Sequence, residues 1–398
     1  MIYAWEQRRL GEVTTKIGSG KTPKGGSAVY LRQGIPLLRS QNITSDAVDF
    51  SDVVYISNEM DTEMGNSRVQ TNDVLLNITG ASIGRSAVYK QMNMANVNQH
   101  VCIVRPTNDI NADFIQLNLT SPNGQQQIGN NQAGGGREGL NFQQIAKIAF
   151  HFPTLLEQSH IGTFFRTLDN TIAIHKRKLD GLRELKKAYL QVMFPQAEEV
   201  VPRVRFAGFT EPWKSKKLGE LGNIVRGSSP RPIQDPIWFD NQSDVGWLRI
   251  SDVTAQNGRI HYLEQKISEA GQAKTRVLTE PHLLLSIAAT VGKPVVNYVK
   301  TGVHDGFLIF LSPQFEQEFM FQWLEMFRPQ WQQYGQPGSQ VNLNSDLVKA
   351  QEIYLPSCEE QISIGNFFVT LDEQITIYSA KIEQLTRLKS AYLQKMFV

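Results

Sequence analysis

The sequence is poor in the features that define several common classes of protein. It has two cysteines, Cys102 and Cys358, one in each half of the chain and neither in a Cys-x-x-Cys pair. Two such cysteines make neither a disulfide framework nor a zinc site, so we expect a reducing, cytoplasmic setting. The segment richest in apolar residues, His282–Val291, is far shorter than the about 18 residues of a membrane span. Residues 1–9 have no apolar core of a secretory signal, and we expect no contact with a membrane.

The sequence also lacks the motifs that mark several classes of enzyme. Adenine methyltransferases use an Asn/Asp-Pro-Pro-aromatic loop, and this sequence contains no Pro-Pro. Residues 18–22 (GSGKT) resemble the end of a phosphate-binding loop, but Thr15 stands where that motif needs its first glycine. Histidine, aspartate and glutamate do not cluster at the spacing of metal ligands. We therefore expect no catalytic residues, no metal and no cofactor in this chain.

Length and charge set only broad limits. Of 398 residues, 41% are apolar and 20% are charged, as in a globular protein of two or three domains. The formal net charge of +2 neither indicates nor excludes a nucleic-acid partner, because local patches steer binding more than the sum does.

The strongest signal is an internal repeat. Residues 5–12 (WEQRRLGE) recur as residues 213–220 (WKSKKLGE), 208 positions later. Further along, we match Gly18-Ser19 with Gly227-Ser228, Leu38-Arg39 with Leu248-Arg249, and residues 75–85 with residues 284–293. From Pro153 to Phe194 and from Pro356 to Phe397 the copies align without a gap, 203 positions apart, and about half of these positions are identical. The chain is a tandem duplication.

The two parts of each copy have evolved differently. The first 150 or so residues of the two copies differ from each other except in short motifs, whereas the two tails are still similar. We infer that the surfaces of the first parts were free to diverge from each other, whereas those of the tails were constrained to stay the same. The expected boundaries are residues 1–152 and 213–355 for two similar heads, 153–195 and 356–398 for the tails, and 196–212 for a linker.

Each head reads as a mixed α/β domain. Residues 73–78, 101–104, 295–299 and 306–311 have the β-rich composition and flanking turn residues of strands. Residues 111–120 and 316–328 have a helical pattern. Residues 130–139 and 334–340 are expected to be loops in equivalent places.

The tails are predicted to be helices that pair with each other. Their apolar residues alternate in steps of four and three, the seam of a coiled coil that Gly181 and lysines within it weaken. Chain order favours an antiparallel pair with pseudo-twofold symmetry, with the heads held about 45 Å apart, close to one turn of B-DNA. The seam residues are Ile161, Phe165, Leu168, Ile172, Leu179, Leu182 and Tyr189, and in the second copy Ile364, Phe368, Leu371, Ile375, Ile382, Leu385 and Tyr392. We also expect packing roles for Trp5, Trp213, Phe164, Phe165, Phe367 and Phe368, and structural roles for His100 and His304.

This organisation resembles the specificity subunits of type I restriction–modification systems over essentially the whole chain. The resemblance rests on residues 5–12 and their copy, on Leu38-Arg39-Ser40 and Gly139-Leu140-Asn141, and most specifically on the two tail beginnings. These carry Pro153, Glu157-Gln158, Ile161-Gly162, Phe164-Phe165 and Leu168-Asp169, and the same words 203 positions later.

The resemblance implies a non-catalytic, DNA-binding function. In this family each variable head, a target-recognition domain, reads one half of a two-part site in double-stranded DNA. The helices set the gap and dock two methyltransferase subunits, which use S-adenosylmethionine to methylate adenine. Restriction subunits that use ATP and Mg²⁺ then complete a nuclease. An alternative is a scaffold whose two heads bind protein, and a further one is a self-contained methyltransferase, against which the missing Pro-Pro loop argues.

Basic and polar side chains of the heads are the candidates for DNA contact. Arg39 and Arg249 either brace the fold or reach a base, where two hydrogen bonds to guanine are worth about 1–3 kcal/mol of discrimination. The turns at residues 79–85 and 290–293 place hydroxyls and a cation beside glycine, which suits a phosphate contact or an ordinary solvated turn. Residues 130–137 and 336–340 are either surface loops or loops that close over the duplex. The complete set of candidates is Lys16, Lys21, Lys24, Arg32, Arg39, Thr79, Arg85, Arg137, Arg226, Arg231, Arg249, Lys274, Arg276 and Lys293.

Overall fold

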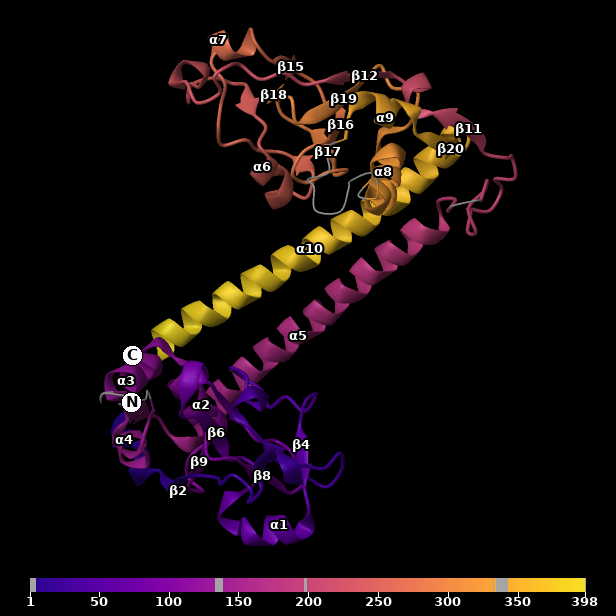
Figure 1. Ribbon diagram of the computed structural model, residues 1–398. Coiled ribbons are helices and arrows are strands. Elements are labelled where there is room, and N and C mark those ends of the chain that lie inside the picture. The colour runs from indigo at the N-terminus through magenta and orange to yellow at the C-terminus, as the bar shows by residue number, and fades with distance from the viewer. Residues whose placement is uncertain (1–4, 133–138, 197–198, 332, 334–342, 398) are drawn as a thin grey trace. The chain divides into compact units, whose positions relative to one another are not determined.

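The computed structural model describes residues 5–132, 139–196, 199–331, 333 and 343–397, which form two compact units (Figure 1). Unit 1 is Met1–Lys176 with Ala380–Val398, and unit 2 is Arg177–Ser379. The division falls within the two long helices, α5 (Leu155–Val192) and α10 (Cys358–Met396). Each unit therefore contains one head, the beginning of one long helix and the end of the other.

The head of unit 1 has three layers. Its main sheet is antiparallel, in the order β2 (Thr14–Ser19), β9 (Val101–Pro106), β6 (Val74–Asn77) and β7 (Ser86–Val88). Side chains alternate along β6, so that Val74 and Leu76 pack with α2 (Ala112–Thr120) and Leu75 packs toward the second sheet. That second sheet has the order β4 (Val54–Ile56), β3 (Ile35–Leu38), β8 (Ala95–Val97) and β5 (Arg68–Val69).

Shorter elements complete this head. The strand β1 (Glu6–Arg9) pairs with β10 (Ala149–Phe152), which leads directly into α5. The remaining helices are α1 (Asn58–Glu63), α3 (Pro122–Asn131) and α4 (Phe142–Lys147). Figure 1 shows α2 alongside β6 and β9, on the side of the sheet that faces the long helices.

The head of unit 2 repeats the plan with changes at its edges. Its main sheet has five strands, in the order β12 (Asn223–Arg226), β19 (Phe307–Leu311), β16 (Leu283–Ser286), β17 (Pro294–Asn297) and β14 (Arg259–Ile260). Leu283 and Leu285 pack with α8 (Gln317–Trp331), and Leu284 packs toward the second sheet. The second sheet has the order β13 (Gly246–Trp247), β18 (Thr301–Val303) and β15 (Arg276–Leu278).

Unit 2 also has a two-stranded sheet that leads into its long helix, equivalent to β1 and β10 of unit 1. The strand β11 (Lys214–Lys217) pairs with β20 (Glu352–Leu355), which leads into α10. The other helices are α6 (Ile250–Ala255), α7 (Glu269–Gln272) and α9 (Ser345–Ala350). The mixed α/β class, the tandem heads and the predicted strands and helices are thus confirmed.

The structure corrects one detail of the repeat. The residue equivalent to Gly227 is Gly20, not Gly18, because each lies just past the first strand of its main sheet and against a carbonyl group. A Cβ at Gly20 would lie 1.6 Å from the Val97 oxygen, and one at Gly227 would lie 2.2 Å from the His304 oxygen. Both positions therefore require glycine because the chain passes too close for any side chain.

Both long helices begin in the same way. The hydroxyl oxygens of Thr154 and Ser357 accept hydrogen bonds from the backbone N–H groups of Glu157 and Glu360, at 3.4 and 3.3 Å. Such a cap satisfies one of the free N–H groups of the first helical turn. The predicted tails are therefore helices of 38 and 39 residues.

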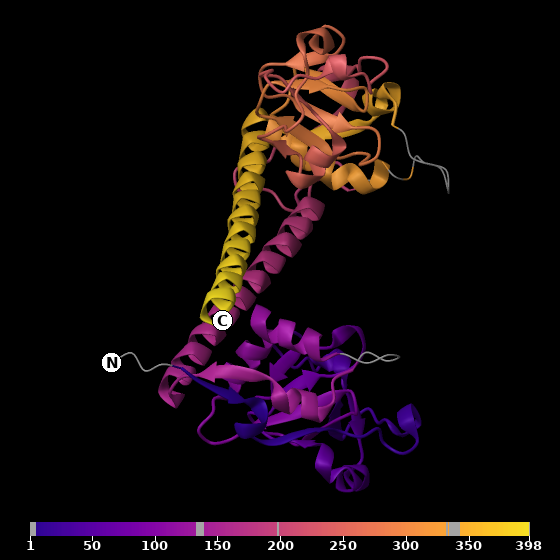
Figure 2. The same ribbon diagram turned by 90° about the vertical axis from the view of Figure 1, so that its left-hand side faces the viewer.

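The two helices are antiparallel, as equivalent contacts in each unit show. In unit 1 the ring of Phe165, near the start of α5, lies 6.0 Å from that of Phe397, just past the end of α10. In unit 2 Phe368, near the start of α10, lies 6.0 Å from Phe194, just past the end of α5. Figure 2 shows the C-terminal end of α10 returning to the first turns of α5.

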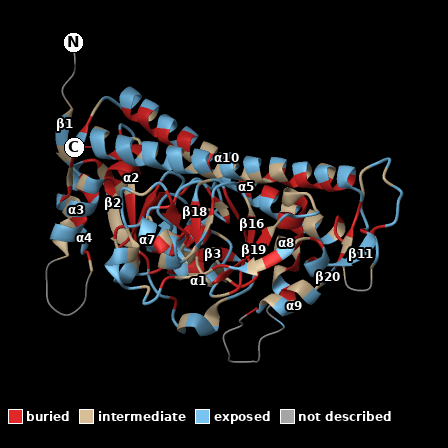
Figure 3. Cartoon of the chain, turned by 90° about the horizontal axis from the view of Figure 1, so that it is seen from above, coloured by how far each residue is buried: buried red, intermediate tan, exposed pale blue. Residues whose placement is uncertain are grey.

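Most predicted seam residues are covered, and Figure 3 shows their buried stripe along both helices. Tyr392 is wrong as a buried seam residue, because 38% of it is exposed and Leu393 is buried in its place. Phe164 is 42% exposed, and its predicted packing role is confirmed, since its ring meets that of Tyr392 at 5.2 Å. Buried seam residues are Ile161, Phe165, Leu168, Ile172, Leu179, Leu182, Ile364, Phe368 and Leu371, and half-buried ones are Tyr189, Ile375, Ile382 and Leu385.

The lysines of the seam have partners that the sequence did not reveal. Lys186 Nζ lies 2.6 Å from Asp372 Oδ1, and Lys389 Nζ lies 2.7 Å from Asp169 Oδ1. Burial lowers the pKa of Lys389, but the hydrogen bonds that its ammonium donates to Asp169 and Asp46 outweigh this effect and raise the pKa above its ordinary value. The lysines are thus neutralised within the seam, not simply weak points in it.

Each head core is completed by the end of the helix that begins at the other head. Leu393 and Phe397 of α10 and its last turn belong to the core of unit 1, around Phe114 of α2. Met193 and Phe194 belong to the core of unit 2, around Phe319 of α8. Among the described residues, no helix combines the length and the apolar character that crossing a membrane requires.

Candidate nucleic-acid interface

Four of the predicted cations come together at one edge of the unit 2 head. The end of β12, the start of β15 and the loop that follows β12 supply Arg226, Lys274, Arg276 and Arg231. Arg226 Nε donates to the Asp305 carbonyl oxygen at 2.6 Å, and Arg231 Nη2 lies 2.9 Å from Asp305 Oδ2. Arg276 Nε donates to the Arg226 carbonyl oxygen at 2.9 Å. Arg226, Arg231, Lys274 and Arg276 are all exposed.

One carboxylate organises this cluster. The Ser229 hydroxyl donates to Asp305 Oδ1 at 2.7 Å, and this hydrogen bond, with the nearby arginines, lowers the pKa of Asp305. Asp305 therefore stays ionised and compensates one of the four positive charges. The excess of positive charge on an exposed edge is what a DNA phosphate backbone attracts.

The equivalent edge of the unit 1 head carries its charge on a different segment. The strand registers place Ser19 of β2 where β12 has Arg226. The following loop supplies Lys21, Lys24 and Arg32, which are exposed and have no ion-pair partner among the described residues. Lys16 is less available, because its ammonium donates to the Asn66 carbonyl oxygen at 2.7 Å and burial lowers its pKa. The two heads thus present similar charge through different side chains.

The matched arginines Arg39 and Arg249 brace the turns that follow β3 and β13. Arg249 Nη2 lies 3.0 Å from Asp252 Oδ1 and 3.2 Å from Glu264 Oε2, and its pKa is raised chiefly by the hydrogen bond to Asp252. Arg39 Nη2 donates to the Asp52 carbonyl oxygen at 3.0 Å. Of the two roles that the sequence left open, the geometry favours bracing.

The two matched glycine turns differ more than their sequences indicate. Arg85 is exposed, and the Thr79 hydroxyl is 2.7 Å from the ring of His100. Lys293, its counterpart in the repeat, is buried, with Nζ 2.5 Å from Glu325 Oε1 and 2.8 Å from Asn257 Oδ1. The geometry therefore does not favour a DNA contact for Lys293, because its charge is already paired inside the fold. Arg137, and most of the loops predicted at residues 130–139 and 334–340, lie outside the described residues.

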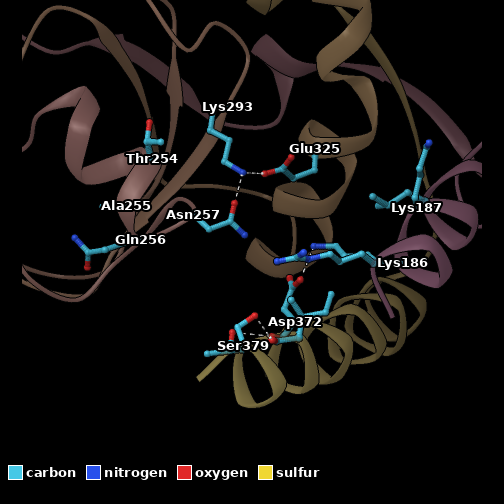
Figure 4. A pocket seen from close by; sticks show the side chains of 14 residues that line it. Lys186, Lys187, Thr254, Ala255, Gln256, Asn257, Lys293, Glu325, Asp372 and Ser379 are labelled. Carbon is cyan, nitrogen blue, oxygen red and sulfur yellow. Dashed lines mark hydrogen bonds and ion pairs between the residues drawn. The ribbon is translucent and has the colours of Figure 1, made fainter. Parts of the chain in front are cut away.

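A polar cleft of about 790 Å³ lies in unit 2 between the long helices and the head (Figure 4). Its walls come from α5, α10, α8 and the turn after α6, and Figure 4 shows Lys293 held between Glu325 and Asn257. Lys186 points to Asp372, and Arg183 and Lys187 also line the cleft. In α10 the positions equivalent to Arg183 and Lys187 are Thr386 and Ser390, so this charge belongs to unit 2 alone.

Sequence reasoning missed the acidic residues that organise these sites. Asp305, Glu325, Asp169 and Asp372 each pair with a lysine or arginine distant in the chain. The repeat gave a signal for two of these residues, since Asp169 and Asp372 occupy equivalent positions in the two tails. Within the part of the chain that the structure describes, no cluster of histidine, cysteine, aspartate and glutamate has the arrangement to hold a metal.

Comparison with known proteins gives one consistent result. The family model of the type I restriction modification DNA specificity domain matches the chain twice, over residues 3–184 and 210–387. The putative type I restriction enzyme MjaX specificity subunit of Methanocaldococcus jannaschii is 21% identical over 402 residues, which cover 97% of this chain and 91% of that protein. The StySPI specificity subunit of Salmonella potsdam is 22% identical over 419 residues, which cover 97% and 86%.

Solved structures agree on the fold. The S subunit of a type I restriction–modification system from M. genitalium has a TM-score of 0.63 at 14% identity, and the match covers 99% of this chain and 96% of that one. A chain from a structure of a type I system that addresses complex assembly has a TM-score of 0.58 at 16% identity and covers 98% and 96%.

Two α/β heads with cationic edges, joined to an antiparallel helix pair, define a DNA-recognition protein. The chain belongs to the type I restriction–modification DNA specificity family and carries two tandem copies of its domain. Its role is to give a type I system its DNA sequence specificity, and the catalytic activities reside on other subunits. The scaffold with protein-binding heads is not supported.

Proposed function

We propose that each head reads one half of a two-part DNA sequence and that the helix pair fixes the gap between the halves. The observation that carries this proposal is the contrast between the two parts of the repeat. Contacts of the helices recur pair by pair, such as Lys186–Asp372 and Lys389–Asp169, whereas the charged edges of the heads differ. Two heads with different charged edges, held by helices with repeated contacts, are suited to reading two half-sites of different sequence.

A duplex-binding experiment tests this reading function. The chain in complex with its methylating subunits should bind a duplex that contains both halves of the site. Scrambling either half should weaken binding by about 10³-fold or more, the usual ratio of specific to non-specific affinity. Exchanging residues 1–152 for the head of another subunit should change only one half of the methylated motif. A change in both halves would contradict the division of labour between the heads.

We further propose that the helices dock two copies of the methyltransferase subunit. Ile174 and Ile377 are each 54% exposed, and Leu185 and Leu388 are each 42% exposed. Leu185 and Leu388 immediately precede the seam lysines Lys186 and Lys389, and Ile174 and Ile377 lie eleven positions before Leu185 and Leu388, on nearly the same side of each helix. The four residues therefore lie along one flank of the helix pair. Unit 1 presents Ile174 and Leu388 and unit 2 presents Ile377 and Leu185, a matched pair of apolar sites for two identical partners.

Subunit counting tests the docking proposal. With I174D and L388D together, the complex should carry one methyltransferase subunit in place of two, as measured by light scattering after gel filtration. Substituting all four residues should leave none, and T167D, on an exposed helix position, should change nothing. Loss of both subunits from the single-unit variant would contradict two independent sites. S-adenosylmethionine, and ATP with Mg²⁺ for restriction subunits, would bind to these partners in the cytoplasm and not to this chain.

A further inference from the structure

The interdomain linker covers a site on unit 2, whereas no described residue covers the counterpart of that site on unit 1 in the same way. In unit 2, Val204 N donates to the Val192 carbonyl oxygen at 2.9 Å, which holds the linker against the end of α5. The next residue, Arg205, forms two hydrogen bonds with Glu360, at 2.9 Å from Nε and 2.7 Å from Nη2. Phe206 then packs edge-on against Phe367, with ring centroids 6.0 Å apart.

The site beneath the linker is built from the repeat and is present in both units. Trp213 Nε1 donates to Glu360 Oε2 at 3.2 Å, and Trp5 Nε1 donates to Glu157 Oε1 at 3.2 Å. Tyr189 and Phe367 meet edge-on at 4.9 Å, and Tyr392 and Phe164 meet edge-on at 5.2 Å. The carboxylate, the indole that orients it and the aromatic pair therefore keep the same geometry in unit 1.

The difference lies in what covers them. Glu360 is 1% exposed and Trp213 is 5% exposed, whereas Glu157 is exposed and Trp5 is half-buried. Phe164 is 42% exposed and the adjacent Leu156 is 68% exposed. Among the described residues Glu157 accepts its hydrogen bond from Trp5, and no cation pairs with it.

We propose that unit 1 binds, at Glu157, Phe164 and Tyr392, an extended segment of a partner polypeptide in which an arginine is followed by an aromatic residue. The occupant is defined by the linker, which shows what the same site accepts in unit 2. A guanidinium binds a carboxylate through two parallel hydrogen bonds, and an aromatic ring one residue later covers the exposed phenylalanine. This inference concerns a protein contact and does not rest on how the heads read DNA.

Joining a copy of the linker covalently to unit 1 tests the site. Because the copy is part of the same chain, even a weak interaction can be detected. Residues 199–212 are placed directly before Trp5 in place of residues 1–4, so that the copied Arg-Phe precedes Trp5 by the same distance as it precedes Trp213. The amides of residues 155–166 should exchange hydrogen about tenfold more slowly, the factor that one charge-assisted hydrogen-bond pair supplies. E157Q or F164A should cancel the slowing, and a graft with both copied residues changed to alanine should not produce it. Slowing that is absent, or that E157Q leaves intact, would overturn the proposal.

Binding in trans tests the nature of the occupant. A labelled peptide of residues 201–208 (VPRVRFAG), added to the unmodified chain, should bind weakly and lose at least tenfold in affinity with E157Q or F164A, at two exposed positions. T167D is the matched control and should bind the peptide as the unmodified chain does. Peptide binding that neither substitution affects would overturn the site. Self-association of the chain that E157Q abolishes would assign the surface to a second copy and overturn the partner assignment.

Discussion

The ammonium of Lys389 lies 2.7 Å from the carboxylate of Asp169, on the opposite helix of unit 1. The side chain is 11% exposed and also lies 2.8 Å from Asp46 of the head, so one cation holds two carboxylates. In unit 2 Lys186 takes the equivalent position, but its partner Asp372 is also bound by Gln322 at 3.0 Å and lies 3.8 Å from Arg259. Asp372 of unit 2 thus has additional partners, whereas among the described residues Lys389 is the ion-pair partner of Asp169 in unit 1.

This difference predicts unequal costs for the two lysines. K389A should lower the free energy of unfolding by about 2 kcal/mol, between the values of exposed and fully buried pairs, because two carboxylates lose their cation. K186A should cost less, since Asp372 keeps other partners. Urea unfolding followed by helix content measures both. Equal costs would show that the additional contacts of Asp372 do not contribute.

The cationic edge of the unit 2 head predicts a change in salt dependence. If Arg231 and Arg276 contact phosphates, R231A and R276A should each reduce the slope of log K against log salt by about 0.9 and weaken specific and non-specific DNA alike. K293M is the matched control, since its ammonium is paired with Glu325. We expect K293M to destabilise the fold and leave the slope unchanged. A change of the slope in K293M would show that Lys293 contributes to DNA binding.

The helix pair predicts that the gap between the half-sites follows helix length. Gly181 has no neighbour within 4 Å of the place of a Cβ, and Gln384 is its equivalent in α10. Inserting one heptad at both positions adds about 10.5 Å of helix, or about three base pairs, and preserves both lysine–aspartate pairs. Mapping of methylated adenines should show a wider gap with unchanged halves. An insertion in one helix alone should abolish methylation, because it shifts the seam register.

His304 predicts a pH dependence of unit 2. Its Nδ1 accepts a hydrogen bond from Gly306 N at 2.9 Å, and its ring lies 4.8 Å from that of Phe307. Burial lowers its pKa below the ordinary value of 6.5, although Asp305 opposes this. The unfolded chain therefore takes up the proton first as pH falls below about 6.5, and stability declines until the pH reaches the native pKa.

Thermal unfolding at pH 7.5 and 5.5 measures this decline. H304N should remove most of the difference between the two midpoints, while H261N, at an exposed position, should keep it. A difference of the same size in H304N would show that another group is responsible.

How far the sequence determined this structure depends on whether a feature repeats. The helices and their pairing were predictable, because two apolar stripes of equal spacing in one chain cover each other. The bracing arginines were visible as a matched pair, although their carboxylate partners were not. Lys293 was misplaced because Glu325 lies 32 positions away in the chain, and no local pattern announces such a pair.

The remaining errors have local physical causes. The spacing of the seam placed Tyr392 inside, but the last turn of α10 turns Leu393 into the head core, which leaves the tyrosine at the surface. The four cations around Asp305 come from segments up to about fifty residues apart, such as Arg226 and Arg276. Their convergence depends on the sheet order, which the strand pattern does not specify.

The placement of Phe397 beside Phe114 has a consequence for how the chain is made. The first head leaves the ribosome with its core open and gains the side chains of Leu393 and Phe397 only when those residues have been synthesised. The second head receives Phe194 before its own strands exist. A nonsense codon in place of Leu393 should therefore damage the head translated first, and limited proteolysis of nascent chains should find that head protected only once Phe397 has left the ribosome.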